Sequence, residues 1–271
     1  MNLNTIVEVK RPRTLDEIQG WREGNAWLGG GTWLFSEPQV HTDTLIDLET
    51  LGWPSLTVSE QGLEIAATCR IAELYAFDAP NKWTEGLLFH ECCRSFLSSF
   101  KIWNEATVGG NIVMSLPAGP MISLTVSLEG TYELWPRDGA GRRVPAADFV
   151  TGSHANVLAP GELLRAIHLP LSALKKRHSF RRASLTHLGR SSVLLIGTRG
   201  SDDLLLTVTA ATIRPVQVRL HEKSDARDLR AAIDAAIPAE LYLDDVHGSS
   251  AHRRHLTYHF AQEICEELFQ A

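Results

Sequence analysis

The chain of 271 residues has few cysteines and no excess of basic residues, and both absences limit what it can bind. Its four cysteines are Cys69, Cys92, Cys93 and Cys265, and no two of them form a C-x-x-C pair. This spacing suits neither a structural zinc site nor a cysteine-ligated iron–sulfur cluster, so we expect buried or half-buried thiols in a reducing compartment. The formal net charge of −6 argues against a nucleic-acid partner, which would favour a basic surface.

Long apolar runs are also missing. No stretch of roughly 18 or more apolar residues is present, so we expect no membrane span. Residues 1–6 contain no basic segment followed by an apolar one, which argues against a secretory signal and favours a cytoplasmic protein. With 44% hydrophobic and 21% charged residues, the composition is that of a soluble globular protein with one large domain or two modest ones.

Two short glycine loops carry the strongest functional signal. The first loop, residues 27–34, has the sequence WLGGGTWL, and the second, residues 106–111, has the sequence ATVGGN. Because glycine has no Cβ, consecutive backbone N–H groups can turn toward an anion. Neither loop is a Rossmann fingerprint or a P-loop, but Thr107 and Asn111 add side-chain hydrogen-bonding groups to the second. Two such loops in one chain predict one diphosphate held from both sides, as in a nucleotide cofactor.

The pattern of apolar residues predicts an α+β chain that begins with a small α/β unit. Residues 7–48 are expected to form strand, helix and strand, with a capping box at residues 14–17 starting the helix. The first glycine loop then lies at the carboxyl end of a strand, where open sheets bind ligands. We expect further strands over 63–67, 132–135, 163–169, 192–198 and 204–213, and helices over 71–77, 83–97, 122–128, 226–236 and 251–269.

Two groups of polar residues are interpreted as solvated surface. His252, His255 and His259 fall on one face of the last expected helix, which is otherwise charged and lacks a His-Glu-x-x-His pattern, so an exposed helix face is favoured over a metal site. The basic run over residues 175–177 is interpreted as a solvated linker rather than an anion site. No catalytic residue and no metal ligand is predicted from spacing.

The glycine loops belong to an ordered set of four segments that resembles a known family. The segments are GGGT at 29–32, LIDL at 45–48, NEATVGGN at 104–111 and PGELL at 160–164. Their order and spacing are similar to those of the FAD-binding medium subunit of molybdenum hydroxylases, of the xanthine dehydrogenase and carbon monoxide dehydrogenase type. The likeness covers residues 7–170 and continues more weakly through the C-terminal region.

The resemblance implies a domain organisation and a set of cofactor-binding residues. A two-part FAD-binding domain would span residues 1–172, with subdomains of 1–54 and 55–172, and a small α+β C-terminal domain would span 173–271. Both loops would contact the FAD diphosphate, and three further residues would approach the flavin. The implied cofactor-binding residues are Trp27, Leu28, Gly29, Gly30, Gly31, Thr32, Trp33, Leu34, Leu97, Thr107, Val108, Gly109, Gly110, Asn111, Pro120, Leu164 and Arg182.

Three positions depart from the family pattern. Pro120 stands where relatives commonly have an Asp, which removes an acidic acceptor for a cofactor hydroxyl or amine. Trp103 replaces the usual basic residue before Asn104, and Arg182 replaces the usual Lys, which keeps the charge but changes its geometry. These changes bear on FAD affinity and on the tuning of the flavin rather than on the fold.

By resemblance, the chain is an oxidoreductase subunit that passes electrons through FAD. The electrons would come from [2Fe–2S] clusters in a small partner subunit and go to NAD, oxygen or another acceptor, while a large partner subunit holds the molybdopterin. Two alternatives stay open at this point. One is a divergent non-enzymatic paralogue that acts as a scaffold, and the other is a self-contained flavin oxidase, for which 271 residues leave little room for a substrate domain.

Overall fold

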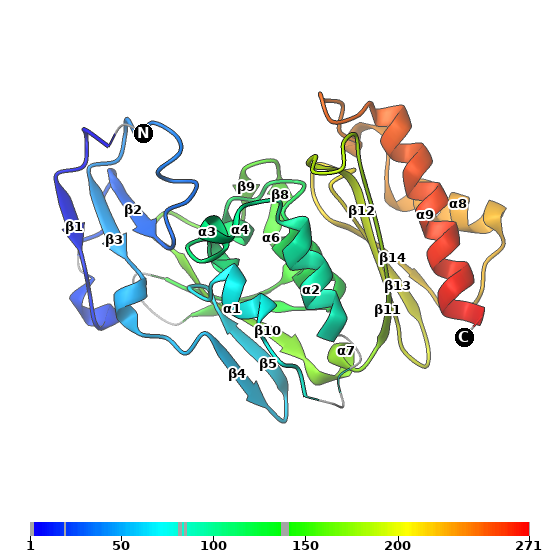
Figure 1. The fold of residues 1–271 in the computed structure, drawn as a ribbon, viewed down its shortest axis with the longest axis horizontal. Helices are drawn as coiled ribbons and strands as arrows, with labels where there is room; N and C mark the ends of the chain where they lie inside the picture. Colours follow the sequence, from blue (N-terminus) through cyan, green and yellow to red (C-terminus); the bar gives the residue numbers. More distant parts are fainter. Residues whose placement is uncertain (1–2, 19, 81–82, 84–85, 137–140, 271) are drawn as a thin grey trace.

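Three sheets follow one another along the long axis of the molecule (Figure 1). The computed structural model describes residues 3–18, 20–80, 83, 86–136 and 141–270. The first sheet is small and parallel, with strand order β1-β3-β2, and it carries the first glycine loop. Its strands are β1 (Glu8–Lys10), β2 (Asn25–Leu28) and β3 (Thr44–Asp47).

The helix expected after β1 is reduced to a single 3-10 turn, η1 (Leu15–Glu17), so this prediction was wrong. The Thr14 side chain makes no capping hydrogen bond. Trp21, which lies in the segment expected to be helical, stacks on Trp27 of β2 with ring centroids 4.6 Å apart. Packing between the two indoles therefore outweighs the local helical pattern. A second 3-10 turn, η2 (Glu49–Leu51), follows β3.

The second sheet has five antiparallel strands in the order β4-β5-β10-β6-β7. It confirms the strands expected around residues 63–67, 132–135 and 163–169. The hairpin of β8 and β9 lies beside it. The strands are β4 (Leu56–Ser59), β5 (Gly62–Ala66), β6 (Thr131–Trp135), β7 (Arg142–Pro145), β8 (Val150–Gly152), β9 (Ala155–Asn156) and β10 (Leu163–Pro170).

The first sheet and its loops, residues 3–54, are called the first unit below, and residues 55–172, with the second sheet, the second unit. Seven helices in the described part of the second unit surround its core. Every residue of α5 is buried, because this apolar helix packs between the second sheet's core and the third sheet. The helix expected over residues 83–97 is shorter than that range, although residues 84 and 85 lie outside the described part. The helices are α1 (Ile71–Tyr75), α2 (Gly86–Ser95), α3 (Phe100–Trp103), α4 (Val108–Val113), α5 (Pro120–Ser127), α6 (Ala146–Phe149) and α7 (Leu171–Leu174).

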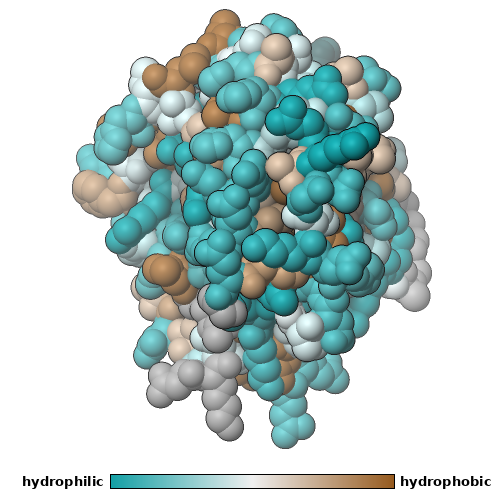
Figure 2. Space-filling view, turned by 90° about the vertical axis from the view of Figure 1, so that its right-hand side faces the viewer, coloured by the Kyte–Doolittle hydropathy of each residue, from teal (hydrophilic) through white to brown (hydrophobic). Residues whose placement is uncertain are grey.

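The third sheet is a four-stranded antiparallel meander between two helical layers (Figure 1). Helices α2 and α5 contact one face, and α9 covers the other with α8 beside it. Hydrophilic side chains cover most of the outer face of this part (Figure 2). The elements are β11 (Arg177–Ser184), β12 (Ser191–Arg199), β13 (Leu204–Thr209), β14 (Val216–Leu220), α8 (Ala226–Ala236), η3 (Ala239–Leu241) and α9 (Ser250–Gln270).

Two expectations from sequence are confirmed, the burial of the cysteines and the exposure of the histidine face of α9. All four cysteines are buried, and burial raises the pKa of the Cys93 thiol to about 12. The three histidines of α9 are exposed. Within the described ranges, no group of three His, Cys, Asp or Glu side chains could hold a metal ion. No described helix is long and apolar enough to cross a membrane.

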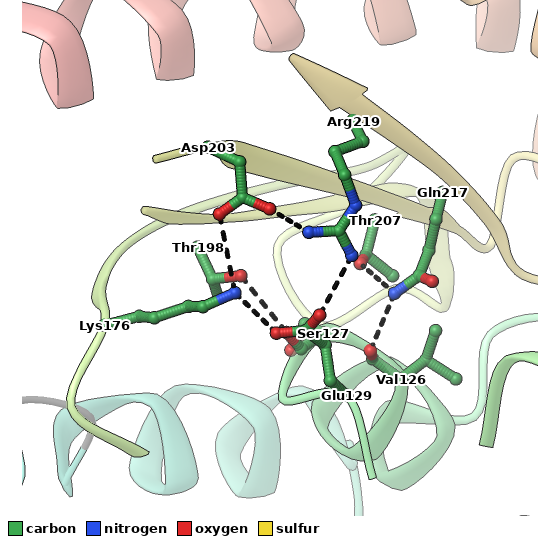
Figure 3. A network of polar contacts seen from close by, with 9 residues as sticks. All are labelled: Val126, Ser127, Glu129, Lys176, Thr198, Asp203, Thr207, Gln217 and Arg219. Atoms are coloured by element: carbon green, nitrogen blue, oxygen red, sulfur yellow. Dashed lines mark hydrogen bonds and ion pairs between the residues drawn. The ribbon is translucent and has the colours of Figure 1, made fainter. Parts of the chain in front are cut away.

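The interpretation of the basic run over residues 175–177 as a solvated linker is wrong for Lys176, while Lys175 and Arg177 are exposed. Lys176 is only 12% exposed, and its ammonium group binds Glu129 at 2.5 Å and Asp203 at 3.8 Å. Arg219 of β14 joins both carboxylates, so four charges form one network between the second unit and the third sheet (Figure 3). Arg177 begins β11. Lys176 and Asp203 are the least exposed of the four, at 12% and 13%, because the two layers meet over them.

The network predicts acid sensitivity in the contact between these layers. Burial alone would raise the pKa of Glu129, but hydrogen bonds from Lys176 and Arg219 outweigh it and hold the pKa below the ordinary 4.5. A carboxyl group whose pKa is lower in the folded than in the unfolded chain stabilises the fold. This stabilisation is complete at pH values above the unfolded-state pKa and is lost as the pH falls through the folded-state pKa. We expect Glu129→Gln to remove this part of the pH dependence of urea unfolding between neutral and acid pH. The control variant Glu60→Gln, at an exposed turn, should keep this pH dependence. Equal pH profiles for the two variants would contradict the role given to Glu129.

Candidate functional site

A cavity of about 460 Å³ lies where the two glycine loops face each other. The first loop leaves the carboxyl end of β2, and the second runs into helix α4, so neither sheet alone could form the site. No charged side chain is among the described residues that line it. Its lining consists of Trp27, Gly29, Gly30, Gly31, Thr32, Trp33, Leu34, Phe96, Ser98, Ile102, Ala106, Thr107, Gly110, Asn111, Val113, Met114 and Leu116.

The first loop offers a row of free hydrogen-bond donors. The backbone N–H groups of Gly29 through Leu34 donate to no acceptor in the part of the chain that the structure describes. The loop turns at Gly31, which has φ +70° and accepts a hydrogen bond from the N–H of Phe35 at 2.8 Å. Six consecutive free donors beside an uncharged cavity suit the oxygens of a phosphate group.

The second loop has a different role, because most of its backbone donors are already used. The N–H groups of Val108 and Gly109 donate to the carbonyls of Cys69 and Ala67 at 2.8 and 2.9 Å. The N–H of Gly110 donates to the Thr107 hydroxyl at 3.0 Å, which caps α4. The second loop can therefore meet a ligand mainly through the Thr107 and Asn111 side chains, while the first loop supplies the backbone donors.

Asn111 joins the cavity to the start of α5. Its Oδ1 accepts a hydrogen bond from the N–H of Met121 at 3.1 Å, which leaves the side-chain amide Nδ2 without a protein acceptor among the described residues. Pro120 is the first residue of α5 and is buried, and it does not line the cavity. Proline suits this position because the first helical N–H has no helical partner. The acceptor that an Asp would provide is absent from the cavity wall.

The first glycine loop packs closely on the segment that enters the second, and Gly30 makes this contact possible. A Cβ added to Gly30 would lie 1.5 Å from the carbonyl oxygen of Glu105, just before the second loop. In the second loop, a Cβ added to Gly109 would lie 2.5 Å from the Cβ of Ala67. Distances this short require the backbone to move. Glycine is therefore needed at both positions so that each loop can approach its neighbour.

Not all of the residues implied by the family resemblance come together in this cavity. Ten of them line it, and seven do not. Leu164 is buried in the core of the second unit, and Leu97 is 36% exposed next to the lining residues Phe96 and Ser98. Those outside the lining are Leu28, Leu97, Val108, Gly109, Pro120, Leu164 and Arg182.

Arg182 lies on β11 and is held within its own hairpin. Its guanidinium donates to the Ser191 hydroxyl at 2.7 Å and to the Gly189 carbonyl. Burial lowers the pKa of Arg182 below its ordinary value. Its role toward a cofactor stays a prediction.

The sequence interpretation missed seven residues of the cavity wall. Three of them precede the second loop in the chain, one is its first residue and three follow it, so proximity in sequence was the available signal. Their apolar character alone indicates a protein core equally well. The missed residues are Phe96, Ser98, Ile102, Ala106, Val113, Met114 and Leu116.

The cap of α4 gives a direct stability prediction. Thr107→Val removes the hydroxyl that accepts the Gly110 N–H, and we expect the free energy of unfolding to fall by about 1 kcal/mol. Thr107→Ser keeps the acceptor and is the matched control. Urea unfolding of the three proteins measures the difference. A Thr107→Val protein as stable as the Ser variant would show that the cap contributes nothing.

Two known proteins resemble parts of this chain in sequence. Xanthine dehydrogenase of Oryza sativa subsp. japonica is 30% identical over 122 residues, which cover 43% of this chain and 9% of that protein. The carbon monoxide dehydrogenase medium chain of Afipia carboxidovorans is 40% identical over 65 residues, or 24% of this chain and 22% of that protein. The matched segments thus span less than a quarter of either relative.

Solved structures show the same fold over the whole chain. A chain of quinoline 2-oxidoreductase from Pseudomonas putida 86 superposes with a TM-score of 0.80 at 18% identity, covering 100% of this chain and 99% of that one. A chain of carbon monoxide dehydrogenase from Hydrogenophaga pseudoflava superposes with a TM-score of 0.82 at 15% identity, covering 98% of both. At this identity the likeness establishes the α+β fold.

The sequence match to a family is more extensive than the match to any of these relatives. Residues 5–172 match the family described as FAD binding domain in molybdopterin dehydrogenase. This range includes both glycine loops and every residue that lines the cavity. The chain belongs to this family of FAD-binding domains of molybdopterin dehydrogenases.

Proposed function

We propose that this protein is the FAD-binding electron-transfer subunit of a molybdenum hydroxylase. The observation that carries the proposal is the row of six free backbone donors, Gly29 through Leu34, beside an uncharged cavity. Such a row suits the diphosphate of FAD. In this proposal residues 1–172 bind the cofactor, through units 1–54 and 55–172, and residues 173–271 form the C-terminal domain.

Different residues of the cavity bind different parts of the cofactor in this proposal. The N–H groups of the first loop hold the phosphate oxygens, and Thr107 and Asn111 bind polar groups of the cofactor from the opposite wall. The apolar side chains of Ile102, Met114 and Leu116 exclude water from part of the cavity. Bound FAD would supply the electron transfer, while the chain provides position, access and electrostatic environment.

The proposed partners follow from what this chain lacks and from its family. A small subunit would hold the [2Fe–2S] clusters and a large subunit the molybdopterin, because the four cysteines here are buried apart from the cavity lining. The carbon monoxide dehydrogenase medium chain of Afipia carboxidovorans supports a separate flavin subunit. NAD, oxygen or another acceptor would receive the electrons, and the assembly would work in the cytoplasm.

Reconstitution of the purified chain with FAD tests the proposal. We expect the two visible absorption bands of an oxidised flavin to remain with the protein after gel filtration. Complete loss of these bands would overturn the proposal and favour the scaffold alternative. If the flavin is retained and a small organic substrate reduces it without any partner subunit, the self-contained oxidase is correct instead. Co-purification from the native cell then identifies the partner subunits.

A further inference from the structure

One arginine outside the cavity connects the two units that form it. Arg70 precedes α1, and its side chain is 23% exposed. One arm, Nη2, donates to the Glu49 carboxylate in η2 of the first unit at 2.7 Å. The other arm, Nη1, donates to the Glu105 carboxylate at 3.0 Å and to the Glu105 backbone carbonyl at 2.9 Å. A single side chain thus holds an element of the first unit against the segment that enters the second loop.

The Glu105 carbonyl is also the atom that Gly30 approaches. A Cβ on Gly30 would lie 1.5 Å from this oxygen, so the first loop packs directly on the atom that Arg70 holds. The backbone around Arg70 is fixed to the same segment, because Arg70 forms a β-bridge with Thr107 and the Ile71 N–H donates to the Ala106 carbonyl at 2.9 Å. The contact between the loops therefore depends on where Arg70 places Glu105.

A simple surface ion pair would not have this consequence. Exposed pairs of one cation and one carboxylate contribute little, because water and salt screen them. Arg70 differs because its side chain is only 23% exposed and makes three hydrogen bonds, one of them to a backbone carbonyl. Its planar fork can serve two carboxylates at once, which the single ammonium group of a lysine does less well.

We propose that Arg70 is a positioning residue that sets the spacing of the two glycine loops and thereby the affinity for FAD. The proposal rests on the proposed function, because FAD is the ligand whose binding it controls. Arg70 itself does not line the cavity. Its effect passes through Glu105 and the first loop.

Titration of apoprotein variants with FAD tests this role. Arg70→Met is expected to weaken FAD binding about tenfold, since a hydrogen bond involving a charged group contributes about 1.5–3 kcal/mol and 1.4 kcal/mol corresponds to a factor of ten. Arg70→Lys should recover part of the loss. The matched control is Arg22→Met, which breaks a two-armed pair with Asp43 in the first unit, away from the second loop. FAD fluorescence reports the dissociation constant, and visible circular dichroism reports the flavin environment.

The salt dependence of FAD binding distinguishes a positioning role of Arg70 from a general loss of protein stability. Added salt should weaken FAD binding to the unaltered protein more than to Arg70→Met, because the Glu49 and Glu105 carboxylates are 66% and 61% exposed. Equal dissociation constants for Arg70→Met and the unaltered protein would overturn the proposal. So would an equal loss of affinity in Arg22→Met.

A measurement without FAD keeps this proposal distinct from the proposed function. Hydrogen exchange of residues 105–113 in the apoprotein should become faster in Arg70→Met and stay unchanged in Arg22→Met. If the unaltered protein binds no FAD, the proposed function fails, and hydrogen exchange alone then decides whether Arg70 fixes the second loop. Unchanged exchange in Arg70→Met overturns the role.

Discussion

Gly30→Ala is expected to abolish tight FAD binding while the chain still folds. The added Cβ would lie 1.5 Å from the Glu105 carbonyl oxygen, which is backbone and cannot rotate away. The first loop must therefore separate from the second, and its row of donors moves with it. Because a misplacement of about 1 Å can cost about a hundredfold at a preorganised site, we expect FAD affinity to fall by at least that factor. Titration of the apoprotein with FAD measures the loss.

The control for this prediction is a glycine with space for a methyl group. A Cβ added to Gly200 meets its nearest atom at 3.6 Å, an ordinary contact, so Gly200→Ala should bind FAD as the unaltered protein does. Circular dichroism and thermal unfolding show whether each variant is folded. A folded Gly30→Ala protein with unchanged affinity would mean that contact between the loops is not needed for binding.

Arg253→Met is expected to lower the free energy of unfolding by about 3–5 kcal/mol, because a buried ion pair loses one partner. Arg253 lies on α9 and is 1% exposed. Its guanidinium donates to the carbonyls of Gly248 and Ala210 at 3.0 and 2.7 Å, and it also binds Asp245. Methionine fills similar space but donates no hydrogen bond, so the Ala210 carbonyl loses its donor and Asp245 loses its cationic partner. Total stabilities of about 5–15 kcal/mol are typical, so this loss is severe.

The neighbouring residue provides the matched control. Arg254 is also on α9, but its side chain is 44% exposed where it pairs with Asp234. Arg254→Met should cost about 0–1 kcal/mol, the usual contribution of an exposed pair. Urea unfolding compares the two variants. Similar losses for both would show that burial of Arg253 is not what makes it important.

Much of the fold was predictable because its elements have strong local patterns. Helix α8 spans Ala226–Ala236 as predicted, since its apolar positions repeat at helical spacing and the Asp225 side chain caps its first turn. The alternating residues of β5 and the apolar residues of α5 were equally informative. These signals lie within a few residues of each other and need no tertiary partner.

The failures have one physical cause in common, which is contact between side chains that the local sequence pattern does not show. The helix expected after β1 gave way to stacking of Trp21 on Trp27. The strand β11 was missed because its sequence is basic, and its charges find carboxylates on other elements, as Arg181 does on Glu263 and Glu267 of α9. A charged residue looks solvated in sequence until its partners are known.

The candidate site, like the fold, was predictable in part. The glycine loops, their order and the family could be predicted from sequence, because loop chemistry depends on adjacent residues such as Gly29, Gly30 and Gly31. Ten of the seventeen residues expected at the cofactor line the cavity. The division of roles, with free donors in the first loop and satisfied donors in the second, was visible only when each acceptor had been located.

The sequence by itself determined the α+β character of the chain, its two glycine loops and its membership of an FAD-binding family. Only the tertiary structure decided which N–H groups have no protein acceptor among the described residues, that Gly30 packs on the Glu105 carbonyl, and that Arg70, Lys176 and Arg253 are enclosed by partners. The physical reason is how far apart in the chain the interacting residues lie. Backbone conformation and helix caps depend on neighbours in the chain, whereas burial of a charge depends on segments that meet only when the layers pack.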